Sequence, residues 1–266
     1  MNARPAIFIT GAAAGIGRAT AERFAAAGWF VGLYDLNEAG VRELQRTLGS
    51  DRACAGRLDV TDGAACARAL AEFFEAAGRR LDVMFNNAGI GQTGDFDTLP
   101  LTQHYVTIEV NFKGVVNGCH AAFPYLKQTP RSCLVSMSSA SAIYGAPGLA
   151  SYAATKFGVK GLTEALSIEW QRHGIRVMDL LPLFVDTAMV RNFESELKAK
   201  RILGMHLTAE DIARTVWRAV HWGRGWARGW PRVHWYPGVQ GWFLALTQKL
   251  SPGWFNRLTT KLISGY

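Results

Sequence analysis

The chain has 266 residues, of which 49% are hydrophobic and 19% are charged, and these proportions fit a globular protein with a sizeable core. No run of about eighteen or more apolar residues predicts a membrane-spanning helix. Four scattered cysteines without metal-ligand spacing predict reduced thiols and no metal site. The formal net charge of +8 arises beyond residue 211, because residues 212–266 contain eight Lys or Arg and no Asp or Glu. A basic excess confined to one end argues against a general nucleic-acid-binding protein.

Short apolar segments alternate with segments of helical periodicity along most of the chain. Strands are predicted at residues 5–10, 29–35, 52–60, 81–89, 132–139 and 175–182, and helices at 17–28, 38–49, 63–78, 102–127 and 151–172. The predicted strands carry Val, Ile, Leu and Phe without polar alternation, as strands covered on both faces do. The alternation therefore predicts an α/β fold of three layers, a Rossmann-type doubly wound parallel sheet, within one domain. The first segment follows the start without the anatomy of a signal peptide, so a cytoplasmic location is expected.

A glycine-rich turn, "TGAAAGIG", joins the first predicted strand to the first predicted helix at Thr10–Gly17. Glycines at three positions permit a tight turn and a close approach of a pyrophosphate to backbone N–H groups at the helix N-terminus. The spacing is GxxxGxG, and Arg18 stands where a Walker loop would need Lys. The turn predicts a dinucleotide site, with a glycine turn that binds no ligand as the alternative.

An acidic residue, Asp35, ends the second predicted strand, where a carboxylate can bind the ribose hydroxyls of a dinucleotide. A 2′-phosphate at that place would be repelled by the carboxylate, and the neighbouring Ala14 and Leu36 supply no compensating base. The sequence therefore predicts NAD(H) rather than NADP(H). The alternative is a surface acid that caps the following helix.

Three side chains with reactive groups, Ser139, Tyr152 and Lys156, lie in and after the fifth predicted strand. Residues four apart share one helix face, so the phenol and the ammonium can address the same bound molecule. A nearby ammonium favours the phenolate, which predicts a pKa of Tyr152 drawn toward the working pH. The serine hydroxyl can hold a substrate oxygen at the carboxyl edge of the sheet. The set suits hydride transfer, whereas the alternative is a packed ring beside a solvated lysine.

These motifs together resemble the short-chain dehydrogenase/reductase family over residues 5 to about 190. The resemblance rests on "TGAAAGIG", "NNAG" at Asn86–Gly89, Asn111 in "VNFKG", "SS" before "YAATK", and "VDT" after the sixth predicted strand. It implies that Tyr152 is the general acid/base and that Lys156 lowers its pKa and holds the nicotinamide ribose. It further implies that Ser139, chosen over Ser138 for its spacing to the tyrosine, orients the reacting oxygen, and that Asn111 anchors a proton-relaying water.

The resemblance also implies a set of cofactor-binding residues, with Asp59 as the adenine contact and Thr187 as the carboxamide contact. That set is Thr10, Gly11, Gly15, Ile16, Gly17, Asp35, Leu36, Asp59, Val60, Asn87, Ala88, Gly89, Tyr152, Lys156, Pro182, Val185 and Thr187, with Asn86 at the floor of the ribose site. One departure is Leu183 after Pro182, where the family usually has glycine. Leucine cannot adopt every backbone conformation of glycine, so Leu183 and Phe184 are expected to narrow the nicotinamide side.

By the same resemblance, substrate lies between the segment after Ser139, the loop after "NNAG" and a lid at about residues 187–207. The expected contacts are Ser139, Ile143, Tyr144, Tyr152, Phe184, Met189 and Phe193, with Gly91, Gln92, Leu183 and Leu197 nearby. This lining is apolar and predicts a small hydrophobic secondary alcohol or ketone, although Met189 and Leu197 could equally belong to the core. Arg191 is the one cation that could fold inward. A homodimer or homotetramer through the helices of Asn111 and Tyr152 is also implied.

Residues 238–266 form a basic, tryptophan-rich tail after a catalytic and dinucleotide-binding domain at 1–237. The segment "RVHWYPG" resembles the family's seventh strand, and two short amphipathic helices follow. Phe255, Leu258 and Leu262 share one helical face, while Arg257 and Lys261 project from another. The tail is expected to cover the active site or a subunit interface, and peripheral membrane contact or nucleic-acid binding are the alternatives. A cofactor-binding scaffold, or a membrane-peripheral interaction protein, without turnover remains the alternative to an enzyme.

Overall fold

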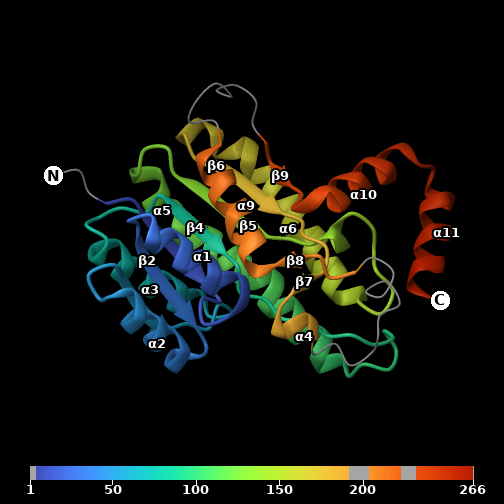
Figure 1. The fold of residues 1–266 in the computed structure, drawn as a ribbon, viewed down its shortest axis with the longest axis horizontal. Helices are drawn as coiled ribbons and strands as arrows, with labels where there is room; N and C mark the ends of the chain where they lie inside the picture. The colour runs from blue at the N-terminus through green and yellow to red at the C-terminus, as the bar shows by residue number, and fades with distance from the viewer. Residues whose placement is uncertain (1–3, 192–203, 223–231, 266) are drawn as a thin grey trace.

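A parallel sheet of seven strands forms the middle layer of the molecule (Figure 1). The computed structural model describes residues 4–191, 204–222 and 232–265. The strand order is β3-β2-β1-β4-β5-β6-β9, and each neighbouring pair is parallel. The strands are β1 (Ala6–Thr10), β2 (Phe30–Asp35), β3 (Ala53–Arg57), β4 (Val83–Asn86), β5 (Cys133–Met137), β6 (Arg176–Leu180) and β9 (His234–Trp235). This order confirms the predicted doubly wound Rossmann-type sheet.

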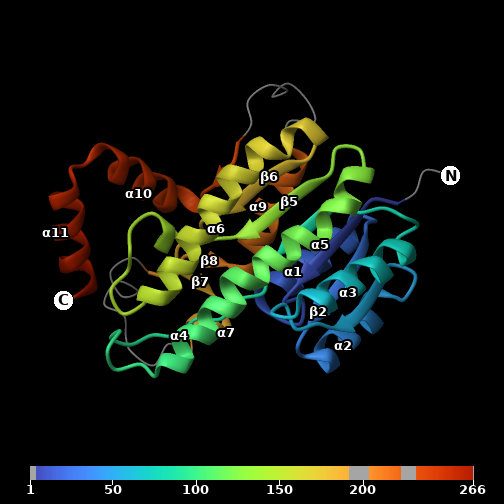
Figure 2. The ribbon, with the colours of Figure 1, turned by 180° about the vertical axis from the view of Figure 1, so that it is seen from behind.

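Helices cover both faces of the sheet and give the expected three layers (Figures 1 and 2). Residues from α1, α2 and α9 share a hydrophobic core with one face, and residues from α3, α5 and α6 share a core with the other. The helices are α1 (Gly15–Ala26), α2 (Glu38–Leu48), α3 (Gly63–Ala76), α4 (Leu101–Ile108), α5 (Gly114–Gln128), α6 (Ala150–Glu169), α7 (Ala188–Arg191) and α9 (Ala209–His221). Two 3₁₀ turns, η2 (Ala140–Ala142) and η3 (Gln171–His173), and a small sheet of β7 (Val185–Asp186) and β8 (Leu207–Thr208) complete this part.

Aromatic side chains fill the two cores. On one face, the ring of Phe24 lies edge-on to Trp29 and Trp217, with centroids 4.9 and 5.0 Å apart. On the other face, Phe8 stacks on Tyr34 at 4.3 Å. The buried rings contribute area and favourable ring geometry to the cores. Trp217 of α9 therefore packs against this core.

The single helix predicted at residues 102–127 is divided in the structure. One π-helical turn, η1 (Glu109–Lys113), separates α4 from α5. A π-turn inserts one residue into the helical hydrogen-bond pattern and shifts the faces on either side of it. Asn111 lies in this turn and its side chain is fully buried.

The tail forms two helices, α10 (Gly238–Leu250) and α11 (Gly253–Ser264), that project from the domain after β9 (Figures 1 and 2). Helix α11 follows α10 at a steep angle and lies at the outer edge of the molecule (Figures 1 and 2). Among the described residues, no helix has the length and apolar character that a bilayer crossing requires. Most of the predicted lid, including Phe193 and Leu197, lies outside the described residues. The division into a domain and a tail stays a prediction.

Candidate functional site at the carboxyl ends of the strands

The glycine turn between β1 and α1 brings the backbone unusually close together. Gly11 and Gly15 have φ angles of +68° and +53°, which favour glycine. A Cβ at Gly17 would lie 2.0 Å from the carbonyl oxygen of Gly11, so any side chain there would collide with the turn. The first residue before α1, Ala14, has no side-chain cap. This turn leaves N-terminal backbone N–H groups of a twelve-residue helix available, an arrangement that fits phosphate oxygens of a dinucleotide.

The carboxylate of Asp35 lies beside this turn at the end of β2. It accepts hydrogen bonds from the backbone N–H groups of Ala13, at 3.0 Å, and Asn37, at 2.9 Å. The cap of α2 is Asn37, whose side chain accepts from the Gly40 N–H. Asp35 therefore does not serve as the helix cap, and its carboxylate is fixed where it lines the cavity next to the turn.

That cavity, the turn cavity, encloses about 280 Å³ between the glycine turn, the end of β4 and the start of α6. Twelve of the predicted cofactor residues line it: Gly11, Gly15, Ile16, Asp35, Asn87, Ala88, Gly89, Tyr152, Lys156, Pro182, Val185 and Thr187. The sequence motifs did not identify Ile90, Met137, Ala188 and Val190, which also line it. These four residues lie one or two positions from predicted site residues, and the path of the backbone brings them into the wall.

Two predicted cofactor residues, Thr10 and Gly17, lie behind the wall of the turn cavity. The Thr10 hydroxyl accepts hydrogen bonds from the backbone N–H groups of Asn87 and Ala88, at 3.0 and 3.1 Å. Gly17 packs against Gly11. Both residues hold the ends of β1 and β4 together and position the residues that form the wall.

Three other predicted cofactor residues, Leu36, Asp59 and Val60, do not line the turn cavity. Leu36 is exposed. The Asp59 carboxylate accepts from the Thr61 N–H and hydroxyl, and Val60 packs against Gly114. The adenine contact assigned to Asp59 stays a prediction, because its carboxylate already stabilises a local turn.

The ammonium of Lys156 lies buried between β5 and the ring of Tyr152. Its Nζ donates to the Met137 carbonyl at 2.8 Å and lies 5.4 Å from the Tyr152 ring centroid. Burial lowers the pKa of Lys156 to about 8. Burial raises the pKa of Tyr152, and a hydrogen bond from Ser139 opposes that rise. Desolvation of the phenolate dominates, so the pKa of Tyr152 lies above its usual value in this structure, and the lowering by Lys156 stays a prediction.

The two neighbouring serines have different environments. Ser138 is buried and its hydroxyl donates to the Lys156 carbonyl at 3.0 Å, which ties β5 to α6. Ser139 lines both cavities at the site beside Tyr152, and its hydroxyl acts to lower the pKa of that phenol. Its Oγ also accepts from the Ser141 N–H at 3.2 Å. The geometry thus favours Ser139 as the hydroxyl that can meet a bound oxygen.

Asn111 reaches the same region from the π-turn. Its Oδ1 accepts from the Ile90 N–H and its Nδ2 donates to the Ile90 carbonyl, both at 2.8 Å. A Cβ at Gly89 would lie 3.2 Å from Asn111 Oδ1 and 3.8 Å from Lys156 Nζ. Asn111 therefore lies across Gly89 from Lys156 and fixes the loop after β4. The water relay implied for Asn111 stays a prediction.

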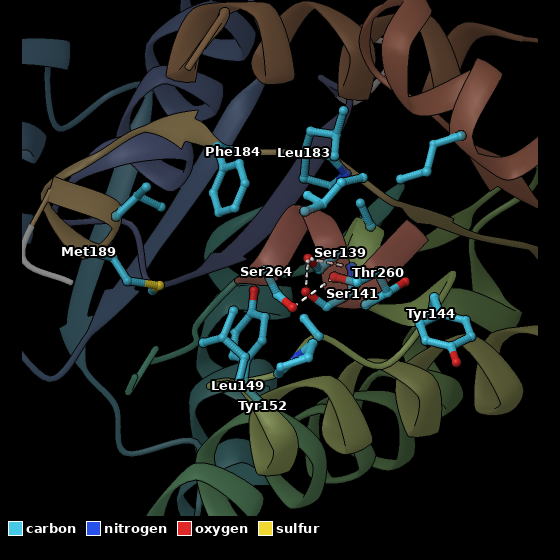
Figure 3. A pocket seen from close by; sticks show the side chains of 17 residues that line it. Ser139, Ser141, Tyr144, Leu149, Tyr152, Leu183, Phe184, Met189, Thr260 and Ser264 are labelled. Carbon is cyan, nitrogen blue, oxygen red and sulfur yellow. Dashed lines mark hydrogen bonds between the residues drawn. The ribbon is translucent and has the colours of Figure 1, made fainter. Parts of the chain in front are cut away.

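A second cavity, the tail cavity, lies on the other side of Ser139 and Tyr152 (Figure 3). It encloses about 170 Å³, and its walls are mostly apolar. The predicted substrate residues that line it are Ser139, Tyr144, Tyr152, Leu183, Phe184 and Met189. Leu183 also lines the turn cavity, so it lies between the two, as its place after Pro182 suggests.

Other predicted substrate residues lie elsewhere. Ile143 is buried in a small core cluster and does not line the tail cavity. Gln92 lines a smaller neighbouring pocket, and Gly91 lines neither the turn cavity nor the tail cavity. Arg191 does not fold inward, because its guanidinium pairs with Asp186 at 2.6 and 3.0 Å. No cation of the described residues therefore lines the tail cavity.

Residues of the two C-terminal helices complete the tail cavity, and the sequence motifs did not identify them. Leu244 of α10 and Thr260, Ile263 and Ser264 of α11 form part of its wall. Leu149 and Ser141 also line it. The spacing of Thr260, Ile263 and Ser264 on one face of α11 was a visible signal, but only the tertiary position of α11 identifies what that face contacts.

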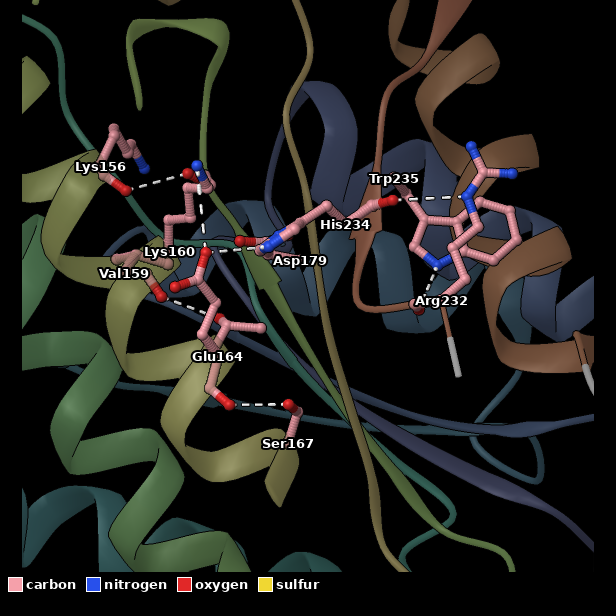
Figure 4. A network of polar contacts seen from close by, with 11 residues as sticks. Lys156, Val159, Lys160, Glu164, Ser167, Asp179, Arg232, His234 and Trp235 are labelled. Carbon is pink, nitrogen blue, oxygen red and sulfur yellow. Dashed lines mark hydrogen bonds and ion pairs between the residues drawn. The ribbon is translucent and has the colours of Figure 1, made fainter. Parts of the chain in front are cut away.

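A polar network holds α6 against the sheet one turn beyond Lys156 (Figure 4). Lys160 and Glu164 continue the four-residue spacing of Tyr152 and Lys156 along the helix. His234 of β9 links Glu164, at 3.0 Å, to the fully buried Asp179 of β6, at 2.7 Å. The network therefore positions the helix that carries Tyr152 and Lys156.

Within the described residues, no group of His, Cys, Asp or Glu is arranged to hold a metal ion.

The chain is similar in sequence to known proteins over most of its length. A family model described as short chain dehydrogenase matches residues 5–198. Among curated proteins, the chain is 34% identical to a meso-2,3-butanediol dehydrogenase of Serratia marcescens over 78% of this chain and 83% of that protein. It is 33% identical to a D-threitol dehydrogenase of Mycolicibacterium smegmatis over 68% of this chain and 70% of that protein.

Solved structures resemble the fold across most of the chain. A short chain dehydrogenase/reductase from Burkholderia phymatum in complex with NAD superposes with a TM-score of 0.79, at 27% identity over 93% of this chain and 92% of that chain. A 3-ketoacyl-(acyl-carrier-protein) reductase from Brucella melitensis complexed with NADH gives a TM-score of 0.78, at 26% identity over 87% of this chain and 96% of that chain.

Proposed function

The chain belongs to the short-chain dehydrogenase/reductase family and is an oxidoreductase of that family, and on this premise we propose that it transfers a hydride between NAD(H) and a hydrophobic secondary alcohol or ketone. The observation that carries the proposal is the position of Ser139 and Tyr152 in the wall shared by the turn cavity and the tail cavity. A dinucleotide in the first cavity and a substrate in the second would meet at these two hydroxyls.

The residues of the site have two kinds of role: one transfers the proton, and the others hold the substrate, the tyrosine or the cofactor wall in position. When bound, the nicotinamide cofactor supplies or accepts the hydride. The Tyr152 hydroxyl exchanges the proton with the substrate oxygen, and the Ser139 hydroxyl holds that oxygen in place. Lys156, fixed by the Met137 carbonyl, keeps a cation beside Tyr152. Asn111 holds the loop that forms part of the cofactor wall.

The preference for NAD(H) rests on Asp35. Its carboxylate is held by two backbone N–H groups at the rim of the turn cavity, where a 2′-phosphate would meet negative charge. The related structures named above carry NAD or NADH. The test compares NADH and NADPH in wild type and in Asp35→Asn, which keeps a side-chain oxygen for the turn. Comparable efficiency of wild type with both cofactors would overturn the preference.

The substrate class follows from the tail cavity. Its wall is mostly apolar, no Lys or Arg of the described residues lines it, and Arg191 pairs with Asp186. A small acidic metabolite would find no charge partner among these lining residues, whereas an apolar ketone would remove apolar surface from water. The relatives described above are named as dehydrogenases of butanediol and of threitol, which supports an alcohol as substrate, whereas the apolar character of the substrate rests on the cavity wall alone.

The central experiment measures NADH absorbance with alcohols and ketones graded by size and polarity. Tyr152→Phe is expected to lose about 10²–10⁴-fold in turnover while it keeps NADH affinity, because only the proton-transferring hydroxyl is removed. Tyr144→Phe is the matched control, since it removes another phenol of the same cavity. Retained turnover in Tyr152→Phe would contradict the assignment. NADH binding without turnover on any compound would favour a cofactor-binding scaffold.

We also propose a homodimer or homotetramer through the helices of Asn111 and Tyr152. Large apolar side chains are exposed on α4 and α6, including Tyr105, Val106, Phe157 and Ile168. Exposed apolar side chains on neighbouring helices are typical of subunit interfaces. Light scattering of the purified chain tests the proposal, and a monomer at micromolar concentration would contradict it.

A further inference from the structure

The two tail helices present their apolar sides to solvent. On α10, Val239, Trp242, Phe243, Leu246 and Leu250 follow one another at spacings of one, three or four residues and are exposed, Val239 by 82% and Leu250 by 78%. Side chains at such spacings share one face of a helix. The opposite face, with Gly241 and Ala245, is the one that packs on the domain.

Helix α11 repeats this orientation. Trp254, Phe255, Leu258 and Leu262 form an exposed apolar face, with Trp254 exposed by 69%. The side turned to the domain carries Thr260, Ile263 and Ser264, which line the tail cavity. Helix α11 therefore shows its smaller and more polar face to the protein and its large apolar face outward, the reverse of an ordinary surface helix. An exposed apolar face of this extent marks a contact site.

Cations border the two apolar faces. Lys249 flanks the face of α10, and Arg257 and Lys261 flank that of α11, all three exposed. Within the described residues, none of the three forms an ion pair with a carboxylate. No Asp or Glu occurs after Asp211 in the chain. The surface is thus apolar at its centre and positively charged at its edge.

We propose that α10 and α11 bind the surface of a membrane that contains anionic lipids. Amphipathic helices with aromatic and aliphatic side chains on one face and cations at its edge lie in the plane of a bilayer, with the apolar face among the acyl chains and the cations at the headgroups. Tryptophan suits this boundary because its ring is apolar and its N–H is polar. Neither helix meets the requirements of a membrane span, which agrees with binding at the surface.

A second copy of the chain fits this surface less well. A twofold contact through it would place Lys249, Arg257 and Lys261 of one copy near the same residues of the other, without an acidic residue of the tail between them. Like charges brought together weaken such a contact. An anionic bilayer instead complements both the apolar face and the cations.

The experiment is co-sedimentation of the full chain with vesicles of phosphatidylcholine alone or of phosphatidylcholine with phosphatidylglycerol. Wild type is expected to sediment with the anionic vesicles and to be released by high salt. Trp254→Ser combined with Leu258→Ser and Leu262→Ser should abolish binding, and because all three side chains are exposed, these changes leave the fold intact. Phe96→Ser, which removes another exposed aromatic ring outside the tail, is the matched control and should bind like wild type.

The contribution of charge is tested by Arg257→Gln with Lys261→Gln. Because each basic residue near an anionic surface contributes about 1 kcal/mol, the partition coefficient should fall about thirtyfold. Arg46→Gln with Arg172→Gln removes the same charge outside the tail and should bind nearly as well as wild type.

Two outcomes would overturn the proposal. One is that wild type stays in the supernatant with anionic vesicles at low salt. The other is that light scattering gives an oligomer which the Trp254, Leu258 and Leu262 changes dissociate, without any vesicle binding by wild type. Neither outcome bears on the proposed reaction, because cofactor affinity and turnover of a soluble ketone are measured separately without vesicles.

Discussion

The side chain of Asn111 holds the backbone of Ile90 by two hydrogen bonds of 2.8 Å, one donated and one accepted. This relationship exists because Asn111 lies in the π-turn between α4 and α5, where the local helical register differs from that on either side. Its amide thereby satisfies both polar groups of one residue in the loop after β4. Ile90 itself lines the turn cavity, so the pair connects the helix layer to the proposed cofactor wall.

Removal of this amide should loosen the cofactor wall. Asn111→Ala leaves the Ile90 N–H and carbonyl without their partners, and an unpaired buried polar group costs about 1–3 kcal/mol. We expect a lower free energy of unfolding in urea and a weaker NADH affinity by titration. Asn117→Ala is the control, since Asn117 makes one 2.8 Å bond to Val60, outside the cavity wall. Equal NADH affinity in both variants would contradict the role of Asn111.

The pH dependence of alcohol oxidation should report the effect of the Ser139 hydroxyl on the pKa of Tyr152. Oxidation needs the phenolate as base, so kcat/KM should rise with pH, and the raised pKa of Tyr152 places this rise on the alkaline side. The Ser139 hydrogen bond lowers that pKa, so Ser139→Ala should move the rise to still higher pH. Ser264→Ala removes another hydroxyl of the same cavity, one that donates to the Thr260 carbonyl within α11, and should leave the profile in place. An unshifted profile for Ser139→Ala would refute the argument.

Much of the sheet was predictable because its signals are local. Buried strands such as β1 and β5 are continuous apolar runs. The glycine turn is recognisable because Gly11 and Gly15 have positive φ angles, which favour glycine. The one-turn spacing of Tyr152 and Lys156 likewise follows from helix geometry alone. These features gave the fold, the family and most of the wall of the turn cavity.

The remaining features depend on tertiary context. The π-turn at Asn111 cannot be predicted from the spacing of apolar residues, because one inserted residue changes that spacing too little to interrupt the helical pattern. The pKa of Tyr152 depends on how deeply the fold buries the phenol, which spacing does not reveal. The contribution of Thr260 and Ile263 to the tail cavity depends on where α11 settles, more than a hundred residues after Tyr152.

Two glycine substitutions should have opposite effects. Gly17→Ala would place a Cβ 2.0 Å from the Gly11 carbonyl oxygen, so the turn must move, and we expect loss of NADH binding and a lower melting temperature.

Gly161 lies inside α6 with open space at its Cβ position. Gly161→Ala should therefore stabilise the chain by up to about 1 kcal/mol through helix propensity. Calorimetry and NADH titration of both variants check this, and normal NADH binding by Gly17→Ala would contradict the close approach.

The pair of Asp179 and His234 should make stability depend on pH. Burial raises the pKa of Asp179 in the folded chain, so between its unfolded pKa of about 4 and its folded pKa the folded chain holds more protons. Stability from this group is complete below the unfolded pKa and is lost as the pH rises through the folded pKa. The His234 hydrogen bond opposes the shift in pKa, so His234→Phe should raise the pKa of Asp179 further. The pH range over which stability falls should then become wider.

At neutral pH, His234→Phe leaves a buried carboxylate without its partner, which costs about 3–5 kcal/mol in free energy of unfolding. The cost should shrink as the pH falls toward 4, because Asp179 is then protonated in the folded chain and no longer a buried charge. Glu164→Gln removes the exposed partner of His234 and should cost less than about 1 kcal/mol at any pH. Urea unfolding from pH 4 to pH 8 measures all three chains. Parallel curves for wild type and His234→Phe would show that His234 does not control the ionisation of Asp179.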